Sequence, residues 1–181
     1  KKGQVQLIGE TDKVVSTYLK AATETQAINL SERKDRSGNG VIRFNSVELL
    51  DENNNKLQAF QTGNKSILSI KFDLKEKKKI DNVVIAMGID DELGQRITQF
   101  SSEITNDLLS LSNEKNTIDI VIDKLPLAQG DYTFTLFAAV NNEIADWIQE
   151  AGTFDVEAGD FFGTGKSLPY GQGNILIQHS F

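Results

Sequence analysis

Gly165-Lys166-Ser167 is the stretch of this sequence closest to a catalytic motif, because it matches the end of a phosphate-binding loop. The full motif requires a glycine five residues before its final glycine, and this chain has Asp160 at that position. The segment then continues through Pro169 into an alternating strand, so no helix N-terminus would face a phosphate. We therefore expect a flexible hinge with an exposed lysine, and no bound ATP.

The acidic, amide-rich run from Asp51 to Asn55 could supply oxygen ligands to a calcium ion. In the EF-hand pattern the invariant glycine would fall at Lys56, and the distal glutamate is missing. Runs of Asp and Asn are also typical of turns, because their side chains bond to nearby backbone amides. The sequence favours a hairpin turn here.

Four aspartates, Asp90, Asp91, Asp119 and Asp123, are candidates for the carboxylate pair of a glycosidase, which must flank a cleft. They fall on turns or on exposed strand positions, where contact with solvent is sufficient to explain an acidic side chain. The chain has no cysteine and one histidine, His179, which excludes thiol chemistry and clustered imidazole ligands. We expect a domain without catalysis, metal or other cofactor. Shortening of a polysaccharide on incubation would support the enzyme alternative.

Composition restricts the partners. The 181-residue chain is 39% apolar and 25% charged, which is ordinary for a domain with a core. Its net charge of −7 argues against nucleic acid and anionic membranes, because both attract stripes of Lys and Arg. No apolar run approaches the roughly 18 residues of a membrane span. A cytoplasmic location fits these features.

From residue 41 onward the hydrophobic period is two, which predicts strands. Ile42 and Phe44 share one face, but Val47 and Leu49 have the opposite parity, so we expect a bulge near Asn45. Strands are expected over residues 41–50, 66–74, 81–90, 96–102, 117–124, 131–140, 144–147 and 152–156. Short strands at regular spacing are typical of an all-β, immunoglobulin-like antiparallel β-sandwich.

The first 40 residues have a different pattern. Residues 1–22 predict a short strand followed by an amphipathic helix. Residues 23–40 are polar and end in a charged, glycine-containing run, which is typical of a solvated, mobile linker. We therefore divide the chain into residues 1–22, a linker over 23–40 and a sandwich domain over 41–181.

The end of the chain, from Ala158 to Phe181, is a glycine-rich arm followed by an alternating strand over about 174–180. A strand needs a sheet edge to pair with, because an unpaired ladder is costly. The edge can belong to this chain or to a second copy, and we expect a second copy. The exchanged residues would be Ile175, Leu176, Ile177, Gln178 and His179.

Several short stretches resemble the C-terminal domain of Wzt-type proteins, the ATP-binding subunits of bacterial ABC transporters that export O-antigen polysaccharide. The matching segments are 46–51 with 62–63, 88–91, 125–127 with 130–132, 154–156, and the most specific one, 159–166. The family's final strand usually ends in His, one residue and Trp, where this chain has His179-Ser180-Phe181. The resemblance covers roughly residues 41–181, and parts of residues 3–18 resemble the last strand and helix of the ATPase domain.

The resemblance implies a carbohydrate-binding module, dimeric through exchanged terminal strands. It would recognise the modified, non-reducing end of a finished O-antigen polysaccharide at the cytoplasmic face of the inner membrane. The missing ATPase domain would connect it to the transmembrane subunit. A purely structural dimerisation module is the alternative.

A sheet face with small and threonine residues could receive a sugar ring, with hydroxyl and guanidinium groups for hydrogen bonds and an aromatic ring for stacking. A glycine inside the strand over 81–90 would also allow a close approach, although a bulge or simple tolerance of glycine explains it equally. The candidate sugar-binding residues are Ala86, Gly88, Arg96, Thr98, Thr133, Thr135, Phe137, Ala139 and Trp147.

Overall fold

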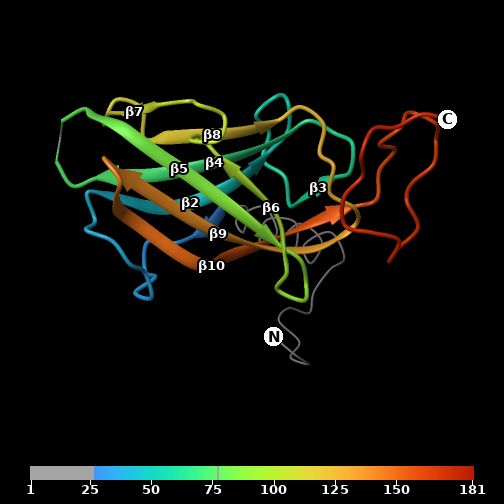
Figure 1. Ribbon diagram of the computed structural model, residues 1–181, viewed down its shortest axis with the longest axis horizontal. Helices are drawn as coiled ribbons and strands as arrows, with labels where there is room; N and C mark the ends of the chain where they lie inside the picture. Colours follow the sequence, from blue (N-terminus) through green and yellow to red (C-terminus); the bar gives the residue numbers. More distant parts are fainter. Residues whose placement is uncertain (1–26, 77) are drawn as a thin grey trace, which may run out of the picture.

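The computed structural model describes residues 27–76 and 78–181, and over these residues the chain forms strands and no helix (Figure 1). The strands are β1 (Ala27–Asn29), β2 (Ile42–Leu50), β3 (Ala59–Gln61), β4 (Ser66–Leu74), β5 (Ile80–Asp90), β6 (Arg96–Ser101), β7 (Leu109–Leu111), β8 (Thr117–Ile122), β9 (Gly130–Val140) and β10 (Glu143–Glu157). No helix in this described part has the length and hydropathy to cross a bilayer.

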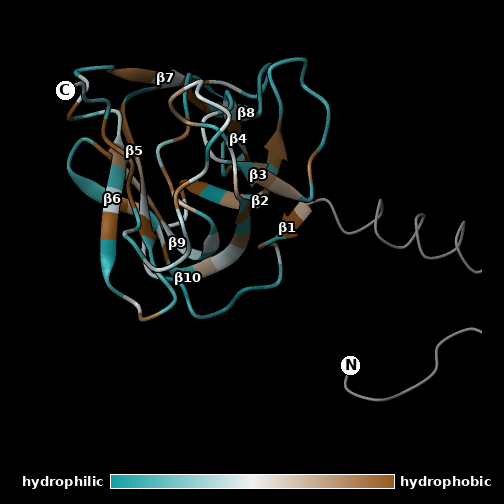
Figure 2. Ribbon diagram, turned by 90° about the vertical axis from the view of Figure 1, so that its right-hand side faces the viewer, coloured by the Kyte–Doolittle hydropathy of each residue, from teal (hydrophilic) through white to brown (hydrophobic). Residues whose placement is uncertain are grey.

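Two sheets pack face to face. One has the order β1-β2-β4-β8, and the other has the order β3-β10-β9-β5-β6, with β7 also paired to β5. Every pairing is antiparallel except that of β3 with β10. Figure 2 shows the layers from the side, with β5, β6, β9 and β10 in one and β2, β4 and β8 in the other. The expected immunoglobulin-like β-sandwich is confirmed.

The bulge expected in β2 is also confirmed. The pairing of β2 with β4 shifts by one residue between Phe44 and Ser46. The extra residue turns the side chains that follow it back toward the core. As a result, the structure buries Ile42, Phe44, Val47 and Leu49. The following segment, from Asp51, is a turn in which the Asp51 carboxylate accepts hydrogen bonds from the Asn53 and Asn55 amides.

The core lies between the two sheets. Burying each large apolar side chain there contributes roughly 1.5–3 kcal/mol before entropy is counted. Phe154 of β10 is its aromatic centre, with ring centroids 5.7 Å from Phe60, 5.8 Å from Tyr132 and 6.4 Å from Phe134. These four rings come from the neighbouring strands β3, β9 and β10 of one sheet, so they fix the core face of that sheet, and the other face of β9 and β10 points away from the core.

The prediction of a linker over residues 23–40 is wrong for residues 27–40. Ala27–Asn29 pairs with β2, and Leu30 is fully buried in the core. Residues 37–40 run beside β10, where the amides of Ser37, Asn39 and Gly40 donate to its carbonyl groups. The polar composition was misleading because these groups bond to backbone of the sandwich and not to water. The strand and helix expected over 1–22 lie outside the described residues, as do residues 23–26.

A buried ion pair joins this N-terminal segment to β10. Arg36 and Asp146 lie 3.5 Å apart, with 5% and 2% of their side chains exposed. Asp146 accepts a hydrogen bond from the Phe44 amide, and Arg36 donates to the carbonyls of Leu30 and Phe44. Burial raises the pKa of the Asp146 carboxyl, against the opposing effects of the Phe44 amide and the Arg36 charge.

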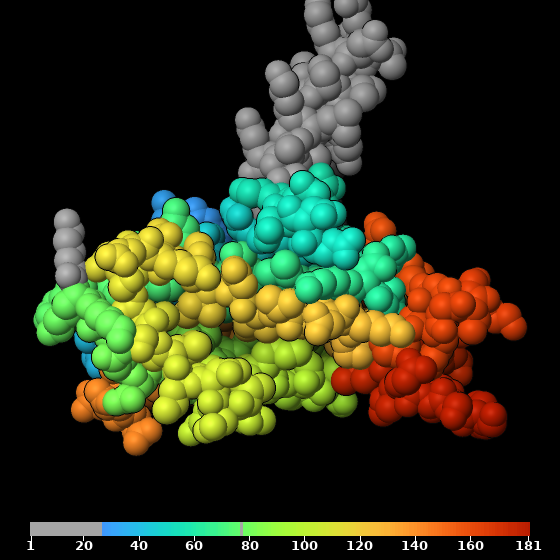
Figure 3. All heavy atoms as spheres, turned by 90° about the horizontal axis from the view of Figure 1, so that it is seen from above, coloured from blue at the N-terminus to red at the C-terminus, as the bar shows by residue number. Residues whose placement is uncertain are grey.

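The C-terminal segment forms a projection at one end of the sandwich (Figures 1 and 3). The expected strand over 174–180 is not regular in this single chain. Ile175 makes one bridge to Leu127, and the Leu176 amide donates to Pro126. Leu176 is buried with Ala128 and Phe161, whereas Ile177 is 74% exposed. The segment is therefore anchored to its own chain at Ile175 and Leu176, and the His179 ring further along also packs edge-on against Phe162, with centroids 5.0 Å apart.

Candidate functional site

A groove of about 480 Å³ lies on the outer face of the sheet that contains β5, β6, β9 and β10. The strands present this face because their alternate residues, such as Met87 and Leu136, fill the core. The groove is lined by Ala86, Gly88, Asp90, Gly94, Arg96, Gln99, Thr135, Phe137, Trp147, Gln149 and Glu150. Six of the nine sugar-binding candidates line it: Ala86, Gly88, Arg96, Thr135, Phe137 and Trp147.

Two aromatic rings form one wall of the groove. Phe137 on β9 and Trp147 on β10 are paired across the strands, with ring centroids 6.4 Å apart and planes at 78°. This edge-to-face geometry is favourable between aromatic rings, so the two side chains hold each other in place. Both rings are half-buried, which leaves apolar surface available for a ligand.

Gly88 and Arg96 form the opposite, polar part. The Arg96 guanidinium donates to the Asp90 carboxylate, from Nε to Oδ1 at 2.5 Å and from Nη2 to Oδ2 at 3.3 Å. It lies directly on Gly88, because a Cβ added there would collide with Nη1 and Cζ of Arg96. The close approach expected at this glycine is therefore made by the neighbouring arginine. Any larger residue at position 88 would force the guanidinium to move away from the strand.

The prediction of Thr98 as a groove residue is wrong, and a bulge explains it. The pairing of β5 with β6 shifts between Ile89 and Asp90, so Arg96 pairs with Asp90 while Thr98 pairs with the core residue Ile89. Thr98 consequently has the core-side parity of Phe100, and Gln99 takes the groove side opposite Gly88. A strict period of two could not locate this extra residue.

Thr133 and Ala139 share the outer face of β9 with Thr135 but do not line the groove. Thr133 pairs with Asp90 and Thr153 at one end of the strand, while Ala139 pairs with Val84 and Ile144 at the other. The prediction that both residues lie on the outer face of β9 is correct. They lie outside the groove because the groove covers only part of the length of β9.

Gln149 and Glu150 line the groove but were missed. They belong to a bulge in β10, where the pairing partner moves from Ile148–Leu136 to Gly152–Phe134. Glu150 has a φ of 44°, in the left-handed region that most residues avoid. The alternation of apolar residues breaks between residues 147 and 152. This break predicts two separate strands, whereas the structure has one strand with a bulge.

The four aspartates have structural partners. Asp90 binds Arg96, as described above, and Asp119 accepts from the Ser69 hydroxyl. Asp91 accepts from the amides of Leu93 and Gln95. Asp123 is 91% exposed beside Lys65. Only Asp90 lies in the groove, so these positions provide no flanking carboxylate pair.

Two backbone amides of the glycine-rich loop before Lys166 already have a hydrogen-bond partner. The Asp160 carboxylate accepts hydrogen bonds from Thr164 at 3.0 Å and from Gly165 at 2.6 Å. These are the groups that would bind a phosphate in a true phosphate-binding loop. Within residues 27–76 and 78–181, no three or more His, Cys, Asp or Glu side chains form a group that could hold a metal ion.

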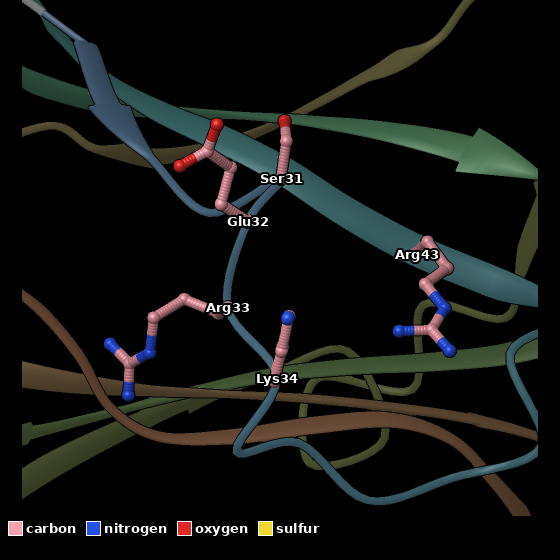
Figure 4. Close-up of a pocket in the computed structure, with 5 residues that line it drawn as sticks. All are labelled: Ser31, Glu32, Arg33, Lys34 and Arg43. Carbon is pink, nitrogen blue, oxygen red and sulfur yellow. The ribbon is translucent and has the colours of Figure 1, made fainter.

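A second hollow, of about 690 Å³, lies at the N-terminal segment (Figure 4). It is lined by Ser31, Glu32, Arg33, Lys34 and Arg43. None of the sugar-binding candidates contributes to it. Figure 4 shows that the Arg33 guanidinium points away from Arg43, and its hydrogen bonds go to Asp35 and to β10.

The fold and the groove define an immunoglobulin-like β-sandwich domain with an open groove of aromatic and polar side chains on one outer face. The family model described as the Wzt C-terminal domain matches residues 33–167, which is more than half of the chain. The chain belongs to the Wzt C-terminal domain family.

The fold also matches a solved structure described as the crystal structure of the C-terminal domain of wzt. The identity is 15%, the TM-score is 0.62, and the match covers 84% of this chain and 98% of that chain. A Pseudomonas aeruginosa immunoglobulin-like protein matches with 14% identity, 70% and 100% coverage and a TM-score of 0.33, which establishes no common fold. No curated protein sequence matches the chain.

Replacing Gly88 with alanine should displace Arg96 and alter the groove without unfolding the domain. The new methyl group would meet the far end of a flexible, half-exposed side chain, so we expect the free energy of unfolding to change by less than about 1 kcal/mol. Ligand affinity should fall by about fivefold to thirtyfold, or roughly 1–2 kcal/mol. Urea denaturation and ligand titration measure the two effects. A Gly130→Ala variant is the control, because Gly130 lies in β9 outside the groove, has no positive φ, and a Cβ added there would meet no atom closer than 3.8 Å.

Proposed function

We propose that this domain is the non-catalytic carbohydrate-binding domain of an O-antigen polysaccharide exporter. It binds the polysaccharide in the groove on β5, β6, β9 and β10 and recognises the modified, non-reducing end of the glycan. Membership of the Wzt C-terminal domain family supports this proposal. The observation that carries it is the groove itself, which combines aromatic rings with hydrogen-bonding side chains.

The groove has the chemistry that a sugar ring requires. The apolar C–H face of a pyranose would pack on Trp147 and Phe137, while its hydroxyl groups would bond to Gln99, Thr135 and Arg96. Such hydrogen bonds largely replace those made to water, so the net gain from each is small. We expect micromolar to millimolar dissociation constants, roughly −8 to −4 kcal/mol.

The proposed setting is the cytoplasmic face of the bacterial inner membrane. There the domain is attached through an ATPase domain to the transmembrane subunit of an ABC exporter. Binding at the groove would then be coupled to the ATPase as a free-energy linkage between two sites. Membership of the Wzt C-terminal domain family supports this setting.

A titration of the 181-residue chain with the O-polysaccharide of its source bacterium tests the function. The same polymer stripped of its terminal modification is the matched ligand. Binding of the intact polymer alone, measured by calorimetry, is the expected result. Equal binding of both polymers would contradict recognition of the end. Binding of neither would favour the structural dimerisation module, and shortening of the polymer would favour an enzyme.

We also propose a homodimer in which the C-terminal segments exchange. Ile177 and Phe181 support it, because they expose apolar side chains beyond the anchored Leu176. Ile177→Asp should then shift the chain from dimer to monomer in analytical ultracentrifugation. Leu93→Asp is the control, since Leu93 is as exposed, at 79%, but lies in the turn between β5 and β6. A dimer that survives Ile177→Asp would argue against exchange through this segment.

A further inference from the structure

The bulge of β10 exposes backbone groups that need partners. On β10 the paired positions step from Ile148 to Gly152, while on β9 they step only from Leu136 to Phe134. The residues in between, 149–151, therefore leave the ladder with β9, and their carbonyl groups require other donors. The positive φ of Glu150 adds backbone strain that surrounding contacts must offset.

Arg33 supplies those donors. Its Nη1 donates to the carbonyl of Glu150 at 2.9 Å and to that of Ala151 at 3.3 Å, and its Nη2 donates to the carbonyl of Gln149 at 3.1 Å. One guanidinium thus binds three consecutive carbonyl groups of the bulge. A lysine could not reproduce this planar arrangement of donors.

Asp35 holds the guanidinium in position. Nε and Nη2 of Arg33 donate to its two carboxylate oxygens, both at 2.7 Å. The side-chain hydrogen bond to Arg33 lowers the pKa of Asp35 to about 2, so the carboxylate stays ionised at neutral pH. Bidentate pairing of this kind fixes the plane of the arginine.

The same segment holds the backbone of Trp147. The amide of Ser37 donates to the carbonyl of Trp147 at 3.0 Å, and the amide of Trp147 donates back to Ser37 at 2.8 Å. Gly38 passes so close to β10 that a Cβ there would collide with the carbonyl of Ala145, and its φ is +123°. Residues 33–38 therefore contact β10 at the bulge and at the groove tryptophan.

We propose that Arg33 is a positioning residue for the groove: by binding the carbonyl groups of residues 149–151 it sets the bulge that carries Gln149 and Glu150 beside Trp147. This inference rests on the proposed function for its effect on a glycan, and on geometry alone for its effect on the bulge. Arg33 itself contacts the bulge from its backbone side and does not line the groove. It belongs to a segment whose composition had suggested a linker.

Arg33→Ala and Arg33→Lys test the proposal, with Arg43→Ala as the matched control. Arg43 lines the same hollow in Figure 4 and carries the same charge, but it makes no hydrogen bond to the bulge within the described residues. The chain has a single tryptophan, so acrylamide quenching of its fluorescence reports on Trp147 alone. Amide exchange of residues 148–152 reports on the bulge directly.

Arg33→Ala should increase both quenching and amide exchange, and should weaken polysaccharide binding by about threefold to tenfold. Arg33→Lys, which keeps the charge and the stem, should fall between Arg33→Ala and the wild type, and Arg43→Ala should match the wild type. Unchanged quenching and exchange in a folded Arg33→Lys chain would overturn the proposal. If the wild-type chain binds no polysaccharide, the proposed function fails, while quenching and exchange still decide the role of Arg33.

Discussion

Replacing Trp147 with alanine is expected to weaken polysaccharide binding by about tenfold to a hundredfold, or roughly 1.4–2.8 kcal/mol. Trp147 is the largest apolar side chain that lines the groove, and such side chains dominate binding energies when a ligand covers them. The loss also removes the edge-to-face contact with Phe137, whose ring would then be free to move. Calorimetric titration of the variant measures the effect.

The control for this substitution is Tyr170→Ala. Tyr170 is an aromatic residue that is 70% exposed and lies in the C-terminal segment outside the groove. Its replacement should leave the affinity unchanged. A Trp147→Ala chain that stays folded and binds with wild-type affinity would place the glycan elsewhere.

Replacing Arg36 with alanine is expected to lower the free energy of unfolding by about 3–5 kcal/mol at neutral pH. The reason is that Asp146 would remain buried without its counter-charge, while the carbonyls of Leu30 and Phe44 would each lose a donor. Domains of this size are stable by only about 5–15 kcal/mol, so the variant should be close to unfolding. Urea denaturation followed by circular dichroism measures the change.

The pH dependence of this effect has a defined sign. Burial raises the pKa of Asp146 above its unfolded value, so the folded state binds this proton more tightly. Well below the unfolded pKa of about 3.9 the carboxyl is protonated in both states and carries no charge penalty. The difference between wild type and Arg36→Ala should therefore shrink as the pH falls from about 7 to 4. A difference independent of pH would contradict the assignment of the cost to a buried charge.

Two further variants separate the charge from other effects. Arg43→Ala removes an exposed arginine nearby and should change stability by less than about 0.5 kcal/mol. Arg36→Met combined with Asp146→Leu removes both charges and should recover most of the loss, because buried ion pairs can be replaced by apolar pairs of similar volume. A double variant as unstable as Arg36→Ala would show that the hydrogen bonds, and not the charge, carry the effect.

The alternation of apolar residues was sufficient to predict the sandwich and most of the groove. Leu136 and Phe134 had to face the core, so Thr135 and Phe137 had to face outward. The bulge in β2 was also predictable, because Ile42 and Val47 could both be buried only if one residue was inserted. In each case the need to bury large apolar side chains determines which face of the strand points toward the core.

The errors occurred where polar groups decide the structure. Nothing in the pattern around Arg96 indicates the bulge that turns Thr98 away and Gln99 into the groove. Residues 33–40 have a composition suited to solvent, yet their partners are backbone groups of β10 that lie far away in the sequence. Hydrogen bonds between distant segments leave no local periodicity, so a single sequence could not show them.

The most direct test of the groove as a glycan site is an amide NMR titration of the 181-residue chain with the O-polysaccharide. The single indole N–H of Trp147 gives one signal, and the amides of Gly88 and Gln99 report on the opposite part of the groove. The proposal predicts that these three signals shift together with increasing polysaccharide. Shifts confined to other surfaces, such as the hollow around Lys34 and Arg43, would contradict it.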